Sequence, residues 1–327
     1  MSALAAELRL RSDPLRLVVW GSWAAIATVA VYFAIDTNNK TAGALFTWVS
    51  FRTILTSVAY VGVFAVATTI IMISGNLFSL SLGTTGAVTA TTFLALLSRG
   101  VGIAMIGTIV LGAAIVLAQG LVVGYLGANP IIVTIAAGGI QQGIFLWATN
   151  GATIVPSFGD SSFTWLNNRY VGLPLAVYVL IGLVLLLELV MRATTFGKQL
   201  YLVGENRRAA RAAGLPVGRV IMLAFGLAGA CVGLVGVELG AFNQSGSLLV
   251  ESTFTYDGIA AAVVGGSAIT GGRGSMIQAL GGACFIATVS DILLLRGYSE
   301  GWQILIKGAI VFVVVVLLRI NRMRASR

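Results

Sequence analysis

The sequence predicts an all-α integral membrane protein with about ten transmembrane segments, some of them short or broken. Of the 327 residues, 58% are hydrophobic and only 9% are charged, and the mean hydropathy is +0.98. A soluble domain carries about 25% charged residues, which it needs to cover its surface. The 41 glycines are typical of helices that approach one another closely in lipid. This composition excludes soluble enzymes, nucleic-acid-binding domains and disordered proteins.

Apolar runs long enough to cross a bilayer, which takes about 20 residues, follow one another along the chain. The first run, 17–35, comes after three arginines and lacks a small-residue cleavage site, so we expect an uncleaved helix rather than a signal peptide. The run 257–270 is too short to cross alone in a straight line, and it either spans or re-enters the membrane. The other predicted segments are 54–73, 77–97, 101–125, 130–148, 170–191, 220–241, 275–295 and 302–318.

The distribution of Lys and Arg predicts the orientation. Thirteen of the twenty basic residues lie in 1–16, 192–219 and 319–327. Because cytoplasmic loops carry an excess of Lys and Arg, we expect both termini and the 192–219 loop to face the cytoplasm. This arrangement needs an even number of crossings, which ten segments satisfy if 257–270 enters the membrane and 275–295 returns. The same bias explains the net charge of +9 without a nucleic-acid partner.

The chain has no room for a soluble domain, so we expect one transmembrane domain over residues 1–327. The longest hydrophilic stretches, 149–169 and 193–219, are too small to form a core. No phosphate-binding G-x-x-x-x-G-K-[ST] motif is present, and the chain contains no histidine, the commonest zinc ligand and general base. We therefore expect a transport protein, not an enzyme, with no catalytic residue, metal site or cofactor of its own.

The first irregular stretch lies between residues 73 and 86. Glycines, serines, threonines and Asn76 interrupt an otherwise apolar run there. In lipid every backbone N–H and C=O needs a partner, so irregular backbone at depth is tolerated only against protein or a water-filled cavity. Broken helices of this kind line the pathways of transporters. We favour a pathway-lining break, and the alternative is a tight turn at the membrane surface.

A second irregular stretch, 260–275, has the same order as the first: a short apolar piece, a glycine-rich break, then a full helix. With ten crossings, the two halves of the chain that contain these breaks have opposite orientations. The pattern therefore predicts an inverted repeat, which many transporters contain.

The loop at about 193–219 contains a predicted short helix over 205–214. Asn206 favours its start, alanines favour its interior, and Gly214 followed by Pro216 ends it. Three alanines share one face and arginines surround it, which suits insertion into the cleft of a partner protein. The alternative is a basic helix that lies on anionic headgroups. The predicted docking segment is Glu205, Asn206, Arg207, Arg208, Ala209, Ala210, Arg211, Ala212, Ala213 and Gly214.

Charged residues within membrane segments are costly and point to function unless they are paired. We expect Glu188 to pair with Arg192 at i, i+4, Lys307 to reach toward the membrane surface, and Asp257 to lie at the start of its short helix. Neutral amides and hydroxyls can match a solute's hydroxyl groups as donors and acceptors. The candidate pathway residues are Asn76, Phe78, Ser79, Ser81, Asn129, Gln141, Gln142, Asn243 and Asp257.

Four motifs together resemble the membrane permease subunit of bacterial sugar ATP-binding-cassette (ABC) importers, of the ribose, xylose and arabinose type. The strongest is Tyr256–Ser275, an acidic residue, an apolar run, a glycine pair and then Gly-Gly-x-Gly-Ser. The others are Pro130–Thr134, Thr195–Gly214 and Trp302–Gly308. The likeness covers roughly residues 50–318.

This resemblance implies a translocation pathway for a sugar or related polyol in the bacterial inner membrane. It implies cytoplasmic ATPase subunits, which hold the ATP and Mg, and a helix at 205–214 that couples to them. A second permease, identical or different, would complete the pathway. A periplasmic or surface-anchored binding protein would deliver the solute.

The chain departs from the family at the first break. Phe78-Ser79 stands where the family has Ile-Asp, so a carboxylate is missing. This leaves open a changed solute or a heterodimer whose other permease keeps the acid. A nucleoside or branched-chain amino acid in the same architecture is the next alternative, and a stand-alone channel or secondary transporter is another.

Overall fold

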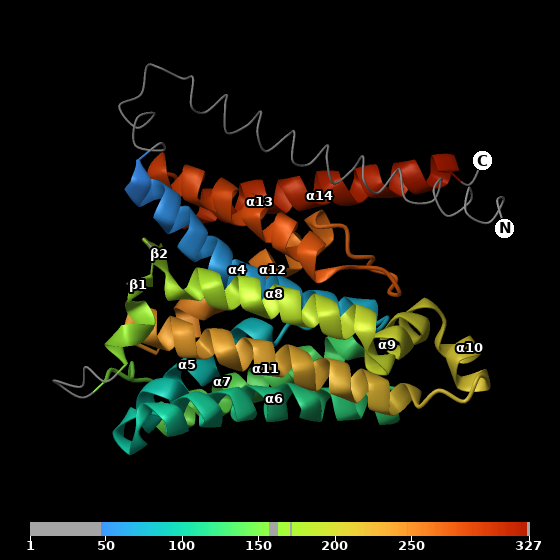
Figure 1. Cartoon of the computed structure of the whole chain (residues 1–327), viewed down its shortest axis with the longest axis horizontal. Coiled ribbons are helices and arrows are strands. Elements are labelled where there is room, and N and C mark those ends of the chain that lie inside the picture. The colour runs from blue at the N-terminus through green and yellow to red at the C-terminus, as the bar shows by residue number, and fades with distance from the viewer. Residues whose placement is uncertain (1–46, 157–162, 171, 247, 326–327) are drawn as a thin grey trace.

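The computed structural model describes residues 47–156, 163–170, 172–246 and 248–325. In these residues the chain is a bundle of long helices that run side by side (Figure 1). The all-α prediction is therefore confirmed in outline. The predicted first segment, 17–35, lies outside the described residues.

The central helix of the bundle is α4 (Trp48–Ile73). It packs against four other helices: α8 (Leu175–Ala193), α11 (Val217–Asn243), α12 (Leu248–Val264) and α13 (Met276–Leu295). Thr47 begins it by accepting a hydrogen bond from the Ser50 backbone N–H at 3.2 Å. Every residue from Val58 to Ile73 is buried. A helix that is apolar on all sides is expected in the core, and this one is surrounded by four other helices.

The closest helix pair joins α6 (Val101–Tyr125) to α11 (Val217–Asn243). Small residues make the approach possible. A Cβ atom added to Gly112 would lie 2.7 Å from the backbone oxygen of Gly229 and 2.9 Å from the Gly233 Cα. Backbone is therefore in contact with backbone, which is how membrane helices pack tightly without an aqueous hydrophobic effect.

The remaining elements complete the bundle around these helices. A short antiparallel hairpin pairs Arg169 with Pro174 and Tyr170 with Leu173 before α8. The other described elements are α5 (Leu82–Leu96), η1 (Leu97–Arg99), α7 (Pro130–Thr149), η2 (Thr164–Asn167), β1 (Arg169–Tyr170), β2 (Leu173–Pro174), α9 (Thr195–Glu205), α10 (Arg207–Ala212) and α14 (Glu300–Ala325).

Within the described residues, six helices are long and apolar enough to cross a membrane by length and composition. They are α4, α6, α7, α8, α11 and α13. The ten crossings, the inverted repeat and the orientation of the termini remain predictions.

Several helix boundaries differ from the predicted segments, and two of these differences concern the breaks and the charged residues singled out above. The helix predicted from residue 77 begins at Leu82, because the break before it keeps an irregular backbone bonded to other helices. The helix predicted from 257 begins at Leu248, because Phe254 extends its packing surface and stacks on Phe64 with ring centroids 5.4 Å apart. Asp257 therefore lies inside α12, and the prediction that it starts the helix is wrong.

We predict that Gly112→Ala weakens the α6–α11 contact, because the new methyl group would meet backbone that cannot move aside. Overpacking of this kind costs about 1–3 kcal/mol, which lowers the apparent melting temperature of the purified protein in detergent. Gly182→Ala in α8 is the matched control, since a Cβ there meets nothing within 4 Å. Equal melting temperatures for the two variants would contradict the backbone contact.

Candidate functional site

The predicted docking segment folds as a short helix with a cap at each end. Asn206 Oδ1 accepts hydrogen bonds from the backbone N–H groups of Arg208 and Ala209 at 3.0 and 3.1 Å. These are donors that an uncapped helix leaves unsatisfied. After Ala213, Gly214 takes a left-handed φ of +78°, which ends the helix. The extended backbone of Asn206 separates α10 from α9, so Glu205 is the last residue of α9 and not part of the α10 helix.

Most of α10 is exposed at one end of the bundle (Figure 1). Ala210 packs inward against the core and is 5% exposed. The exposed members of the predicted segment are Glu205, Asn206, Arg208, Ala209, Arg211, Ala212, Ala213 and Gly214. The three alanines of the predicted smooth face are therefore all accessible.

Arg207 turns inward, toward the first break. Its Nη2 donates to the backbone oxygen of Gly75 at 2.9 Å and to Asn76 Oδ1 at 2.5 Å. Partial burial, with a smaller contribution from the charge of Arg211, lowers the pKa of Arg207 from its ordinary value. The guanidinium thus binds at the C-terminal end of α4, where unpaired carbonyls and the helix dipole favour a cation.

The second break reaches the same place. The Gly272 backbone N–H donates to the Ile73 oxygen at 3.0 Å, and Tyr201 of α9 donates its hydroxyl to the Gly274 oxygen at 2.8 Å. Gly272 has a φ of +71°, which glycine adopts readily. A Cβ on Gly204 would lie 2.7 Å from the Gly272 nitrogen and closer still to Ile73 backbone. Only glycine fits there.

Three segments far apart in the sequence therefore meet at one point, which we call the three-segment junction. It consists of residues 73–76 from the first break, 204–207 from the end of α9 and the start of α10, and 271–274 from the second break. The sequence singled out each of the three segments separately, and the fold brings them together.

Glu188 of α8 holds the helix that follows the second break. Its Oε2 accepts from the Met276 backbone N–H at 2.8 Å and from the Ser275 hydroxyl at 3.0 Å. Arg192 donates from Nε to Glu188 Oε1 at 2.6 Å, which confirms the predicted i, i+4 pair. The cap on α13 was not predicted, although Ser275 just before an apolar helix is a typical helix start.

The interior of the first break is buried and hydrogen-bonded to neighbouring helices. Ser81 donates to Gln119 Oε1 of α6 at 2.8 Å, and Ser79 lies 3.1 Å from Ser81. The Leu80 backbone N–H donates to Thr134 Oγ1 of α7 at 3.2 Å. Ser79 and Ser81 have no exposed surface. These two serines are therefore enclosed by protein, whereas Leu77 in the same break is exposed. The choice between a pathway-lining break and a turn at the membrane surface remains a prediction.

The other predicted pathway residues do not form one cluster. Gln141 of α7 is 7% exposed and accepts from Thr85 Oγ1 at 2.8 Å. Asn129 caps α7 by accepting from the Ile131 N–H at 2.9 Å. Phe78 is half-buried and packs beside Met72, whereas Gln142 is exposed on α7, Asn243 ends α11, and Asp257 lies within α12.

Two residues that hydrogen-bond to the first break were not singled out from the sequence. Gln119 and Thr134 contact the first break, and each is a polar residue within an apolar run. An isolated glutamine in such a run could have been recognised as the partner of another polar residue in the membrane.

Residues 50–315 match the profile of a family described as the permease component of branched-chain amino acid transport systems. Among individual proteins, the chain is 33% identical over 196 residues to the probable ABC transporter permease protein YphD of Escherichia coli K12, and 30% identical over 189 residues to the ribose import permease protein RbsC of Bacillus subtilis. These alignments cover 60% and 58% of the chain and 59% of each relative. The match to the E. coli K12 ribose import permease RbsC, at 26% identity, covers 90% of the chain and 91% of that protein.

We predict that the Arg207–Asn76 contact stabilises the junction. In a double-mutant cycle of Arg207→Ala and Asn76→Ala, the two effects on the free energy of unfolding should be non-additive by about 1.5 kcal/mol, the low end for a hydrogen bond to a charged group, because Arg207 is partly exposed. Denaturant titration of the purified protein measures this. Arg211→Ala, an exposed arginine on the same helix, should change stability by less than about 0.5 kcal/mol. Strict additivity in the cycle would refute the contact.

Proposed function

Because the chain belongs to the permease-component family of branched-chain amino acid transport systems, we propose that it forms the transmembrane pathway of an ABC importer for a neutral monosaccharide or related polyol. The observation that carries the proposal is the three-segment junction. It connects an exposed helix, suited to contact by a partner, with the two breaks in the membrane helices. The relatives named as ribose import permeases support the solute class.

The exposed helix α10 is the proposed contact for a cytoplasmic ATPase subunit, which would carry the ATP and Mg. Helices that lie on a membrane surface bury large apolar side chains such as Trp, Phe and Leu. The exposed face of α10 offers Ala209 and Ala212 with Arg208 and Arg211 around them. Small side chains beside arginines have little to bury in lipid, but they fit a protein cleft that has acidic residues at its rim.

The junction supplies a path for movement from α10 into the membrane helices. A displacement of α10 would move Arg207, and with it the end of α4 at Gly75 and Asn76. The Gly272–Ile73 hydrogen bond would pass the same displacement to the second break. Packed helices switch between discrete arrangements rather than deforming continuously, so a small shift at such a point can change the state of the whole pathway.

The polar groups buried beside the first break favour an uncharged solute. Ser81, Gln119 and Gln141 are neutral. In the described part of the chain, the side-chain nitrogens of Gln119 and Gln141 are buried without a hydrogen-bond partner. An unpaired buried donor costs about 1–3 kcal/mol, so a solute hydroxyl that accepts these hydrogen bonds would be stabilised. An amino acid would need charged partners at this position, and Ser81, Gln119 and Gln141 offer none.

The remaining partners follow from the same proposal. A second permease, identical or different, completes the pathway in the bacterial inner membrane, and a periplasmic or surface-anchored binding protein delivers the solute. With the Lys- and Arg-rich 192–219 loop in the cytoplasm, both termini would be cytoplasmic. The exposed apolar face of α7 is available to lipid or to the second permease, and includes Ile132, Ile135, Ile140 and Ile144.

We predict that Ala209→Trp, and separately Arg208→Glu, uncouples ATP hydrolysis from uptake. A weaker α10 contact should lower sugar import per ATP hydrolysed by about tenfold, which corresponds to about 1.4 kcal/mol of lost interaction. The assay uses proteoliposomes that contain the permease with its ATPase and binding protein, and labelled D-ribose, D-xylose and D-allose in turn.

Leu202→Trp on α9 is the matched control, because Leu202 is also exposed, at 55%, but lies outside α10. This variant should import normally. Normal import by both α10 variants would show that the ATPase does not act through this helix. Uptake by the permease alone, without ATP, would instead point to a channel or secondary transporter.

A further inference from the structure

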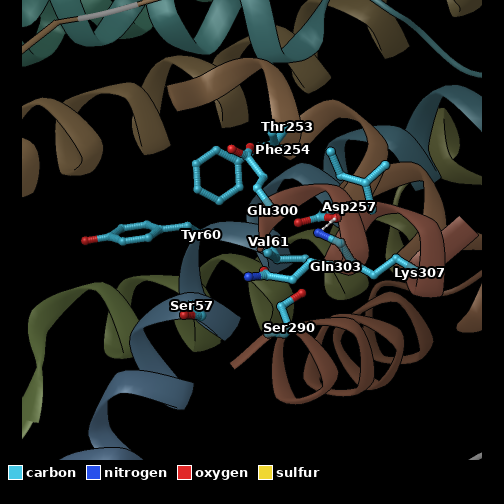
Figure 2. Close-up of a pocket in the computed structure, with 12 residues that line it drawn as sticks. Ser57, Tyr60, Val61, Thr253, Phe254, Asp257, Ser290, Glu300, Gln303 and Lys307 are labelled. Carbon is cyan, nitrogen blue, oxygen red and sulfur yellow. Dashed lines mark hydrogen bonds and ion pairs between the residues drawn. The ribbon is translucent and has the colours of Figure 1, made fainter. Parts of the chain in front are cut away.

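A polar cavity of about 200 Å³ lies away from the junction, between α4, α12, α13 and α14 (Figure 2). The Trp48 end of α4 and the Glu300 end of α14 lie together at the end of the bundle opposite α10, and the cavity is in that half (Figure 1). In the predicted orientation this half faces the outside. None of the junction residues contributes to the cavity wall.

The cavity wall contains an ion pair between two motifs that the sequence analysis singled out separately. Lys307 Nζ of α14 donates to Asp257 Oδ1 of α12 at 2.7 Å, and the two side chains are only 13% and 12% exposed. Lys307 is thus held by a carboxylate rather than reaching toward the membrane surface, which corrects the expectation from its position in the sequence. Figure 2 shows the two charged groups meeting close to Gln303.

A buried ion pair adds little to the stability of the folded protein, since apolar residues of similar volume often stabilise it as well or better. Within a membrane segment such a pair points instead to function. An ammonium group has three N–H donors and a carboxylate has two acceptor oxygens. In the described part of the chain this pair uses one donor and one oxygen on each other, which leaves hydrogen-bonding capacity that faces the cavity.

The other lining residues complete a surface that suits a sugar. Gln303 donates from Nε2 to the Tyr298 oxygen at 3.1 Å, which leaves its amide oxygen available as an acceptor. Ser290 donates its hydroxyl to the Ile286 oxygen at 2.9 Å, so its oxygen is available as an acceptor, and Phe254 adds an aromatic wall. Phe254 is held in place by its stacking on Phe64. A polyhydroxyl ring has both polar edges and apolar C–H faces, so it needs this combination.

Volume and charge together limit the class of ligand. About 200 Å³ is below the roughly 300–1,000 Å³ of sites for drug-sized ligands, so a monosaccharide fits and an oligosaccharide does not. Lys307 and Asp257 neutralise each other, so a neutral solute can bond to the closed pair. Glu300 also lines the cavity and adds carboxylate acceptors for solute hydroxyl groups. Glu300 could pair with the ammonium of a zwitterionic amino acid, but the carboxylate of that amino acid would have to take Lys307 from Asp257.

From these observations we propose that the cavity is a binding site for a neutral monosaccharide, held by the Asp257–Lys307 pair and Gln303 against Phe254. The inference rests on the proposed function, and it places the site that first receives the solute within a single permease, on the side opposite α10.

The test measures whether a sugar protects the cavity from chemical labelling in the full transporter. Ser290→Cys is made in a background where Cys231 and Cys284, both free cysteines, are changed to serine. The introduced thiol is labelled with a membrane-impermeant maleimide in the presence of D-ribose, D-xylose, D-allose, L-leucine or maltose at millimolar concentration. At ten times its dissociation constant, a sugar that occupies the cavity should slow labelling by about tenfold, because only the empty site reacts. Ser98→Cys, an exposed position outside the cavity, should be labelled at the same rate with every solute.

A second variant tests the ion pair without relying on labelling. Asp257→Asn keeps the shape of the side chain and should raise the sugar concentration for half-maximal uptake by about tenfold or more, as expected when a hydrogen bond from a charged group is lost. Import per ATP hydrolysed at saturating sugar should stay normal, which separates this site from the α10 contact.

The proposal is overturned if the thiol of the Ser290→Cys variant cannot be labelled, if none of the three monosaccharides protects it, or if leucine protects it in their place. It is also overturned if Asp257→Asn leaves half-saturation unchanged. Each of these results, with normal ATP-driven sugar import, would leave the proposed function standing.

Discussion

The interaction on which the account depends is the pair of hydrogen bonds from Arg207 to the C-terminal end of α4. The guanidinium donates to the Gly75 backbone oxygen and to the Asn76 side-chain oxygen, just beyond the last residue of α4, where the helix dipole favours a cation. Because Arg207 belongs to α10, the same two bonds fix an exposed helix to the first break of the membrane bundle. Without them, α10 would be attached to the first break only through the packing of α9 and the loop.

Glycine makes this junction possible. Gly204, Gly271 and Gly272 lie where any Cβ would meet the backbone of another segment. The three segments of the junction therefore approach as closely as their main chains allow. Glycines along α6 and α11 allow the same close approach of backbone to backbone between these two helices. Close backbone contact with few interlocking side chains allows helices to move relative to one another without repacking a large core, which suits a protein that must alternate between two arrangements.

The sequence was sufficient for the fold class and for the local features of the breaks and of α10. Caps and turns depend on the residue type at a single position, so the roles of Asn206, Gly214 and the glycines of the second break could be predicted from the sequence. What it could not show was pairing over long distances. Arg207 was expected on the surface of α10, and Lys307 was expected to reach toward the membrane surface, because the partners Asn76 and Asp257 lie 131 and 50 residues away. The start of α12 was missed for a related reason, since Phe254 is stabilised by Phe64 rather than by its neighbours in the sequence.

The central claim, that α10 and the first break move as one body, is tested most directly by pulsed electron paramagnetic resonance on the full transporter. Spin labels are placed at Ala212 on α10, at Leu77 in the break and at Trp147 on α7, all exposed positions. When ATP is bound, the 212–77 distance should stay constant while both labels move relative to Trp147. A change in the 212–77 distance while the 77–147 distance stays fixed would contradict the account.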